Sequence, residues 1–291
     1  GCRDFFVAYA AEAAEVLDLA PASEISVLHG PFSPNDAAYI RARGIKPVIN
    51  SLQQARFWLD AGGGVCDLMV DTGINRLGIA MDALGDDTIR QLEIDVLVSH
   101  LASADEDTPF NTTQHSRWQA ARASIAHRRA SLANSAGIML GAQYHGDLTR
   151  PGIALYGGIP RPELAGVIRQ VAHPTVRIMQ VRDVSAGDTI GYNRLWTADR
   201  QTRVGVVAIG YADGFLCTWS NKGFMLHDGA RLPVVGRVSM DMTLIDLSDT
   251  PHLREGDWVE VEYALPEAAV ASGLSQYELI TILARRFVRG A

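Results

Sequence analysis

An arginine and a rigid turn stand side by side in the segment Thr149-Arg150-Pro151-Gly152-Ile153-Ala154-Leu155-Tyr156-Gly157-Gly158. Pro151 has no backbone donor and Gly152 lets the main chain approach a ligand closely, so Ile153 and its neighbours can present N–H groups to an anion such as phosphate. Arg150 is permanently charged and offers only donors, which suits an acceptor that must stay unprotonated, such as a pyridine nitrogen. A structural arginine at a domain junction is the alternative.

Polar clusters also occur in three other segments of the first half. They are Asp71-Thr72-Gly73-Ile74-Asn75-Arg76-Leu77-Gly78, Ser99-His100-Leu101-Ala102-Ser103-Ala104-Asp105-Glu106 and Ala133-Asn134-Ser135-Ala136. Alone, a histidine is more often a core residue than a catalyst, and Asn-Ser is a common helix cap. Four clusters that each lie at the end of an apolar run are harder to explain as packing, because a surface that binds nothing does not need two arginines.

Short apolar runs alternate with longer amphipathic ones up to about residue 158, which is typical of repeated βα units around a parallel sheet. Helix starts are predicted at Ser33-Pro34 and, as a capping box, at Ser51-Leu52-Gln53-Gln54. Seven strands are one short of a (β/α)₈ barrel, so we expect a TIM-type barrel whose first strand and helix lie upstream of Gly1. An open doubly wound sheet is the alternative. The predicted strands are Asp4–Ala8, Ile25–Leu28, Pro47–Asn50, Asp67–Asp71, Ile94–Ser99, Ser131–Asn134 and Gly152–Tyr156.

The second half changes to strands separated by tight turns. We therefore expect two domains, a barrel over residues 1–160 and a mostly β domain over residues 161–291, with one helix near the end at Ser275–Arg286. The overall fold class is α/β. The predicted strands of the second half are Thr175–Val184, Arg203–Ile209, Leu232–Leu247 and Asp257–Tyr263.

Composition restricts the class of partner. The chain has 291 residues, of which 47% are hydrophobic, and a formal net charge of −7. This balance argues against a nucleic-acid surface, and no apolar run is long enough for a membrane span, so we expect a small-molecule ligand. The three cysteines have no metal-ligand spacing, so we expect no metal site, and a reduced, cytoplasmic location follows. A targeting signal upstream of Gly1 is a separate possibility.

These residues carry a resemblance to the alanine racemases, which are fold-type III pyridoxal-phosphate enzymes. The resemblance spans nearly all of the chain and rests on the four segments above together with Ile209-Gly210-Tyr211-Ala212-Asp213-Gly214 and Gly236-Arg237-Val238-Ser239-Met240-Asp241. It implies interconversion of L- and D-alanine, either to supply D-alanine for peptidoglycan or to degrade alanine.

The resemblance also implies roles at the cofactor. Arg150 would face the pyridine nitrogen, and Arg76 would reach the phenolic oxygen and the substrate carboxylate, which the Met240 backbone amide would also contact. An arginine at the pyridine nitrogen keeps that nitrogen unprotonated and limits side reactions. Ser135, Gly152, Ile153 and Tyr277 would hold the phosphate and Asn134 would line the same pocket, while Tyr211 and Asp105 would lie at the entrance.

Inversion of a stereocentre needs a base on each face. Tyr192, in Ile190-Gly191-Tyr192-Asn193, matches the tyrosine base of the family, and His100 would link it to Arg150. Tyrosine is a weak base at neutral pH, so it needs cationic neighbours. The family forms a head-to-tail homodimer in which Tyr192, Tyr211 and Met240 would reach the site of the partner subunit.

Two departures from the family stand out. The Schiff-base lysine of the family occurs in a Lys-Ala-Asp-Ala-Tyr-Gly context on the first barrel strand, and this sequence has only Lys46 and Lys222. Lys46 precedes a strand and Lys222 lies in a loop of the β domain, so we expect this chain alone to be inactive. Met69 stands where many members have a carbamylated lysine, which leaves the support of Arg76 open. A fold-type III decarboxylase and a non-catalytic cofactor-binding fragment are the alternative functions.

Overall fold

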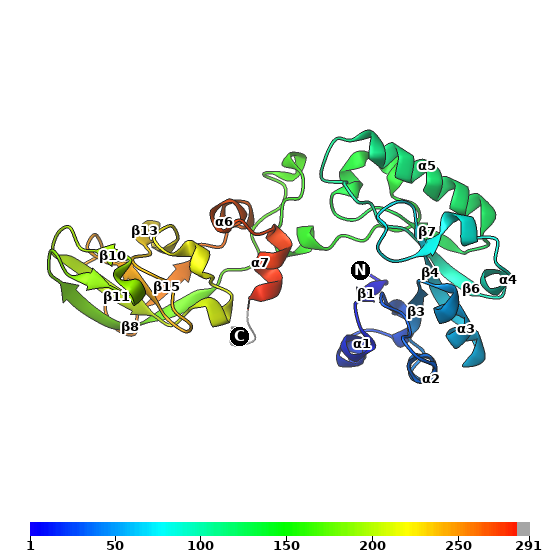
Figure 1. Cartoon of the computed structure of the whole chain (residues 1–291), viewed down its shortest axis with the longest axis horizontal. Helices are drawn as coiled ribbons and strands as arrows, with labels where there is room; N and C mark the ends of the chain where they lie inside the picture. Colours follow the sequence, from blue (N-terminus) through cyan, green and yellow to red (C-terminus); the bar gives the residue numbers. More distant parts are fainter. Residues whose placement is uncertain (284–291) are drawn as a thin grey trace. The chain divides into compact units, whose positions relative to one another are not determined.

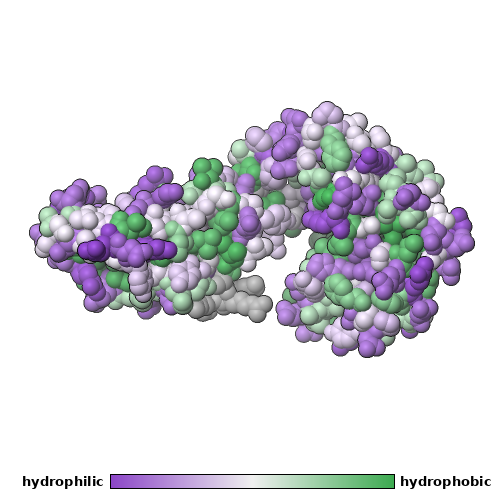
Figure 2. Space-filling view, viewed as in Figure 1, coloured by the Kyte–Doolittle hydropathy of each residue, from purple (hydrophilic) through white to green (hydrophobic). Residues whose placement is uncertain are grey.

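The structure is a computed structural model that describes residues 1–283. The chain divides into two compact units, Gly1–Gly152 and a second unit that begins at Ile153. Figure 1 shows the helices around the sheet of the first unit and the antiparallel strands of the second. Hydrophilic side chains cover much of the visible face of each unit (Figure 2). Within the described residues, no helix is long and apolar enough to cross a bilayer.

The first unit is built on a parallel sheet whose strands are neighbours in chain order, β1-β2-β3-β4-β6-β7, with β5 beside β4. A doubly wound sheet would reverse this order at a switch point, so the sequential order confirms the half-barrel and the α/β class. The strands are β1 (Phe5–Val7), β2 (Ile25–Val27), β3 (Lys46–Ile49), β4 (Val65–Asp71), β5 (Ile79–Ala80), β6 (Glu93–Val98) and β7 (Arg129–Ser131). The helices are α1 (Ala10–Val16), α2 (Pro34–Ala42), α3 (Leu52–Asp60), α4 (Asp87–Arg90) and α5 (Pro109–Ser124).

Two of these helices begin where the sequence predicts. The Ser33 hydroxyl accepts a 3.1 Å hydrogen bond from the Asp36 amide, and Pro34 occupies the first turn of α2. Ser51 caps α3 through the Gln54 amide at 3.1 Å. The predicted capping box is only half right, because the side-chain oxygen of Gln54 accepts a 2.8 Å hydrogen bond from the backbone amide of Asn50 rather than from that of Ser51.

Strand alternation separates two apolar layers in the first unit. Leu68 and Leu97 belong to the larger cluster, which includes helix residues such as Trp118. Their strand neighbours Met69 and Val98 belong to a smaller cluster with Val48 and Val96. Because successive side chains of a strand point to opposite faces, the sheet has one face under the helices and one face inward, as a barrel wall requires.

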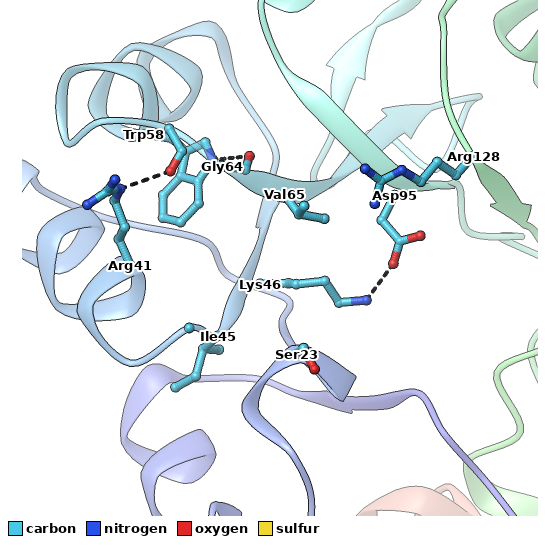
Figure 3. A pocket seen from close by; sticks show the side chains of 11 residues that line it. Ser23, Arg41, Ile45, Lys46, Trp58, Gly64, Val65, Asp95 and Arg128 are labelled. Atoms are coloured by element: carbon cyan, nitrogen blue, oxygen red, sulfur yellow. Dashed lines mark hydrogen bonds and ion pairs between the residues drawn. The ribbon is translucent and has the colours of Figure 1, made fainter.

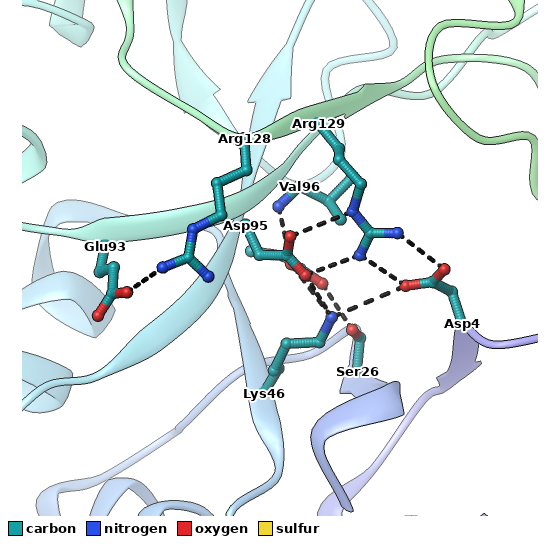
Figure 4. Close-up of polar contacts among 9 residues, drawn as sticks. Asp4, Ser26, Lys46, Glu93, Asp95, Val96, Arg128 and Arg129 are labelled. Atoms are coloured by element: carbon teal, nitrogen blue, oxygen red, sulfur yellow. Dashed lines mark hydrogen bonds and ion pairs between the residues drawn. The ribbon is translucent and has the colours of Figure 1, made fainter. Parts of the chain in front are cut away.

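Charged side chains, of which Lys46 and Asp67 are buried, join the amino ends of these strands (Figure 4). Lys46, the first residue of β3, donates a 2.7 Å hydrogen bond to Asp95 of β6. Asp67 of β4 is fully buried and accepts from the Ser26 hydroxyl at 2.6 Å. Arg129 at the start of β7 bonds both Asp95 and Asp4. We call Asp4, Lys46, Asp67, Asp95 and Arg129 the ionic cluster.

The predicted strand Gly152–Tyr156 is wrong, because residues Ile153–Tyr156 form a 3₁₀ turn. The turn closes through a 3.0 Å hydrogen bond from the Gly158 amide to the Ile153 carbonyl, and Gly157 follows at φ 88°. Leu155 and Tyr156 are exposed, so their strand propensity is not supported by packing. Parallel pairing occurs slightly earlier, as a single bridge between Asn134 and Arg150.

The second unit contains an antiparallel sheet with the order β13-β12-β15-β8-β11-β14. Its strands are β8 (Thr175–Val184), β11 (Thr202–Val207), β12 (Phe224–His227), β13 (Ala230–Pro233), β14 (Thr243–Asp246) and β15 (Trp258–Val261), and a separate hairpin joins β9 (Thr189–Ile190) to β10 (Trp196–Thr197). The predicted strand Leu232–Leu247 is wrong as one element, since it is interrupted after Pro233, with Gly236 at φ 79°, and β12 was not predicted.

Two helices, α6 (Leu265–Ser272) and α7 (Gln276–Ile282), follow the sheet. The predicted start of the last helix is confirmed, because Ser275 caps α7 and forms a capping box with Glu278. The residues predicted beyond 283 lie outside the described part of the chain.

Candidate active site

Arg150 is held by three acceptors at the carboxyl ends of two strands. Its guanidinium donates to the Ser131 hydroxyl, to the Ser99 carbonyl and, at 3.4 Å, to the Leu132 carbonyl. Burial lowers the pKa of Arg150 to about 10, so the group remains a cation at neutral pH. The predictions did not assign a role to Ser99 or Ser131. Both are small polar residues at strand ends, which is the signal that singled out the neighbouring segments.

His100 directly follows Ser99 and is uncharged at neutral pH. Burial, and to a lesser extent the positive charges of Arg150 and Arg76, lower its pKa to about 4. The sequence prediction treated His100 and Arg150 together as cationic neighbours of a tyrosine base. The structure restricts the positive charge to the arginines, so His100 can act only as a neutral hydrogen-bonding group.

Asp71 organises the loop that carries Arg76. One oxygen of its carboxylate accepts from the amides of Gly73 and Asn75, at 2.8 and 3.1 Å, and Asn75 adopts φ 54°. Arg76 itself is exposed. Met69 belongs to the inner apolar cluster, so its side chain offers Arg76 no charge.

Asn134 and Ser135 lie next to Arg150 in the first unit. The Asn134 side chain accepts a 2.8 Å hydrogen bond from the Gly137 amide, so it caps the following turn, as the structural alternative for this residue predicts. The Ser135 hydroxyl accepts a 2.9 Å hydrogen bond from the Gly152 amide. The structure therefore brings together two of the four groups predicted to hold a phosphate.

The other two groups, Ile153 and Tyr277, meet in the second unit. Gln276 at the start of α7 exchanges two hydrogen bonds with the backbone of Ile159, at 2.7 and 2.9 Å. This places the half-exposed Tyr277 against the turn that begins at Ile153. Burial raises the pKa of Tyr277, and a backbone hydrogen bond from Ile153 opposes the rise.

Tyr211 and Met240 are neighbours in the second unit. The Tyr211 amide donates to the Ser239 carbonyl and the Ala212 amide to the Met240 carbonyl, at 3.0 and 2.9 Å. Gly210 is required there, since a Cβ atom would lie 2.4 Å from the Met240 carbonyl oxygen.

Tyr192 lies close to the same loops, because a Cβ atom on Gly191 would be 3.4 Å from the Arg237 nitrogen. The side chains of Tyr192, Tyr211 and Met240 are 68%, 41% and 52% exposed. The three residues predicted to serve a partner subunit are thus gathered and available at the surface of this unit. Asp105, predicted at the entrance, is exposed in the first unit.

Lys46 occupies the amino end of the strands, as the sequence predicts. It lines a cavity of about 390 Å³ with Arg41, Trp58 and Arg128, and its amine points to Asp95 (Figure 3). Its side chain is 6% exposed, and its amine is also within 4.0 Å of Asp4 and Asp67. Lys222 is exposed in a turn of the second unit.

Comparison with known proteins gives two family matches. The model described as the alanine racemase N-terminal domain matches residues 1–160, and the model described as the C-terminal domain matches residues 171–291. A biosynthetic alanine racemase of Agrobacterium fabrum is 38% identical, covering 99% of this chain and 80% of its own length. A catabolic alanine racemase of the same organism is 37% identical, covering 99% and 79%.

Solved structures agree with these matches. An alanine racemase from Bartonella henselae with covalently bound pyridoxal phosphate has a TM-score of 0.90 and 31% identity, covering 99% of this chain and 85% of that one. The biosynthetic enzyme from Pseudomonas aeruginosa has a TM-score of 0.86 and 34% identity, covering 99% and 84%. Because the two family models span both units, this chain belongs to the alanine racemase family.

Proposed function

We propose that this chain provides the cofactor site and one proton-transfer residue of an alanine racemase that uses pyridoxal 5'-phosphate. The observation that carries the proposal is the fixed, permanently charged Arg150 beside a neutral His100 at the carboxyl ends of the strands. Parallel half-barrels place their chemistry at that end. The relatives and structures compared above are named as alanine racemases, which favours racemisation over decarboxylation.

The chemistry of the donor set fits the cofactor. Arg150 has donors only, so it can bind a pyridine nitrogen that carries no proton. The resemblance assigns the phosphate to Ser135 and Gly152 of the first unit and to Ile153 and Tyr277 of the second. In each pair the backbone amide already donates to the hydroxyl group, so a bound phosphate would replace these contacts as the acceptor of the amides. When bound, pyridoxal phosphate withdraws electrons from the α-carbon of an amino acid and makes its proton acidic.

We infer that Tyr192 is the base on one face of the substrate. A phenol is a weak base at neutral pH and becomes effective near positive charge. His100 is neutral, so Arg150 is the source of that charge and His100 can only transmit a hydrogen bond. Arg76 and the Met240 amide are proposed to bind the substrate carboxylate.

The second base of the family is a lysine, and neither lysine of the printed sequence suits that role. The amine of Lys46 is paired with Asp95 at the opposite end of the strands, and Lys222 lies in a turn of the second unit. We therefore propose that the residues of this sequence serve one face of the substrate, through Tyr192, and that neither Lys46 nor Lys222 serves the other face.

The test combines binding and exchange. The purified chain is titrated with pyridoxal phosphate and with pyridoxal, which lacks the phosphate, and tighter binding of the phosphorylated form is expected. Incorporation of solvent deuterium at the α-carbon is then followed for each enantiomer. We expect incorporation into L-alanine that is lost in Tyr192→Phe and kept in Tyr156→Phe, an equally conservative change at another exposed tyrosine. Equal binding of the two ligands, or equal exchange of both enantiomers, contradicts the proposal.

Borohydride reduction of the chain with pyridoxal phosphate tests the lysines. No stoichiometric pyridoxyl label is expected on Lys46 or Lys222. Stoichiometric labelling of either one, together with conversion of L- to D-alanine, would show that a lysine of this chain completes the site.

A further inference from the structure

A fully buried glutamine of α5, Gln114, holds the segment that follows β6. Its side-chain nitrogen donates to the Thr72 hydroxyl at 3.2 Å and to the His100 carbonyl at 3.0 Å. Its side-chain oxygen accepts from the Ala102 amide at 2.8 Å. One amide group therefore brackets residues 100 to 102 and connects them to the end of β4.

The chemistry of these partners fixes the orientation of the amide. The His100 carbonyl can only accept and the Ala102 amide can only donate, so the nitrogen and oxygen of Gln114 cannot be exchanged. Both hydrogens on its nitrogen have acceptors. Every polar group of this buried side chain is thus satisfied, which is the condition under which a buried amide stabilises a unique arrangement.

The hydrogen bonds beyond Gln114 also have one direction. The Ser99 hydroxyl donates to the Val70 carbonyl at 2.8 Å, so its oxygen accepts from the Thr72 hydroxyl, 2.8 Å away. Thr72 in turn accepts from Gln114. This series of hydrogen bonds runs from Gln114 through Thr72 and Ser99 to the Val70 carbonyl of β4, and the three side chains are fully buried.

The same helix also holds the main chain of Thr72. Arg117, one turn after Gln114 on α5, donates a 3.0 Å hydrogen bond to the Thr72 carbonyl. Ser99 is the residue whose carbonyl accepts from the Arg150 guanidinium. The position of Arg150 and that of the His100 backbone therefore both depend on the segment that Gln114 and Thr72 hold.

We infer that Gln114 and Thr72 are positioning residues, which set the place of Arg150 and His100 at the cofactor through the backbone of residues 99 to 102. The inference deepens the proposed function and rests on it for the identity of the ligand. Neither residue touches the cofactor in this scheme. Their effect is transmitted by the carbonyls of Ser99 and His100.

Three variants separate this role from general packing. Gln114→Met keeps the length of the side chain and removes its three hydrogen bonds. Thr72→Val removes the hydroxyl, while Thr72→Ser keeps it and removes only a methyl group. Because Thr72→Ser preserves the directed chain, it should behave like the unmodified protein. The Thr72 pair carries the test if Gln114→Met does not fold.

Asn111 offers a matched control on the same helix. It is also a buried amide, and it donates to the carbonyls of Ser103 and Glu106 at 3.1 and 3.0 Å. Asn111→Leu therefore disturbs the next segment of the same loop without removing a contact to residues 99 to 102.

The first measurement is amide hydrogen exchange of Ala102 in the unliganded chain, followed by NMR. Because the lost hydrogen bond of the Ala102 amide alone costs about 1 kcal/mol, Gln114→Met should accelerate this exchange about fivefold or more, while other amides of α5 keep their protection. Thr72→Val should accelerate it to a smaller extent, and Thr72→Ser and Asn111→Leu should not. Unchanged exchange in Gln114→Met, or equal acceleration throughout the first unit, overturns the inference.

The second measurement is the dissociation constant for pyridoxal phosphate. We expect it to rise about fivefold or more in Gln114→Met and Thr72→Val, and to change less than about twofold in Thr72→Ser and Asn111→Leu. Faster Ala102 exchange with unchanged affinity overturns the positioning role. If the unmodified chain binds no pyridoxal phosphate, the proposed function fails, and the exchange of Ala102 still decides whether Gln114 holds the segment.

Discussion

Arg129, the first residue of β7, donates hydrogen bonds of 2.9 and 2.8 Å to the carboxylate of Asp4, which lies 125 positions earlier, just before β1. Among the named strands of residues 1–283, β1 pairs only with β2 and β7 only with β6, so this fork connects the first and last strands of the sheet without pairing between their backbones. Bidentate pairs of arginine and carboxylate are geometrically specific. The amino ends of the two outer strands are therefore joined by side chains.

Asp4→Asn should destabilise the first unit by about 1 to 3 kcal/mol, because it removes a charged partner from Arg129. Arg129 retains Asp95, at 2.7 Å, which limits the loss. Glu93→Gln is the matched control. Glu93, the first residue of β6, pairs with Arg128, but both side chains are more than half exposed. The free energy of unfolding is therefore expected to change by no more than about 0.5 kcal/mol. Urea denaturation of the two variants measures the difference, and equal effects would mean that the fork does not stabilise the sheet.

Asp95 should make the free energy of unfolding depend on pH in the acidic range. Burial alone would raise its pKa, but hydrogen bonds and positive charge from Arg129 and Lys46 prevail and lower it to about 2. A folded-state pKa below the unfolded value gives stability that is complete above about pH 4 and is lost as the pH falls toward 2. The expected contribution is about 2 kcal/mol.

The measurement is the free energy of unfolding between pH 5 and 2, compared with that of Asp95→Asn. Because Asp95→Asn removes the carboxylate whose pKa is lowered, it should flatten the decline in stability toward low pH. Asp67 does not contribute to this decline, since burial raises its pKa and the charge of Lys46 only partly offsets the rise. A decline that is unchanged in Asp95→Asn would assign the acid sensitivity to other carboxylates.

The sequence predicts the location of the site better than its internal contacts. The sequence singles out His100 because it follows a predicted strand and Arg150 because it stands beside a Pro-Gly turn, and the resemblance predicts their roles. Gln114 could not be found in this way, since it lies in a helix 42 positions from Thr72 and its burial depends on tertiary packing. The predicted strand at Gly152–Tyr156 failed for a related reason. Ile153 and Tyr156 favour strands locally, but among residues 1–283 no strand pairs with them, and residues Ile153–Tyr156 form a local turn instead.

The neutral state of His100 can be tested directly by NMR titration of its imidazole. We expect a pKa near 4 in the unmodified chain, because burial and then the charges of Arg150 and Arg76 disfavour the imidazolium. Arg150→Met should raise this pKa, while Arg150→Lys, which keeps a positive charge, should raise it less. The change in Arg150→Met should remain incomplete, since burial persists. Titration of His100 near 6.5 in the unmodified chain would contradict the neutral state.

The exposed residues of the second unit predict self-association. Tyr192, Tyr211 and Met240 are gathered on neighbouring loops, and Met240 is 52% exposed. Burial of such a side chain in a dimer is favourable by about 1.5 to 3 kcal/mol, so Met240→Asp should weaken a homodimer at least about tenfold. Val270 is 88% exposed and provides the control, because Val270→Asp adds the same charge on helix α6 rather than on these loops. Sedimentation velocity over a range of concentrations measures the dissociation constants. A chain that is monomeric at every concentration, or equal weakening by the two variants, would exclude Met240 from the interface and remove the support for a site shared between two subunits.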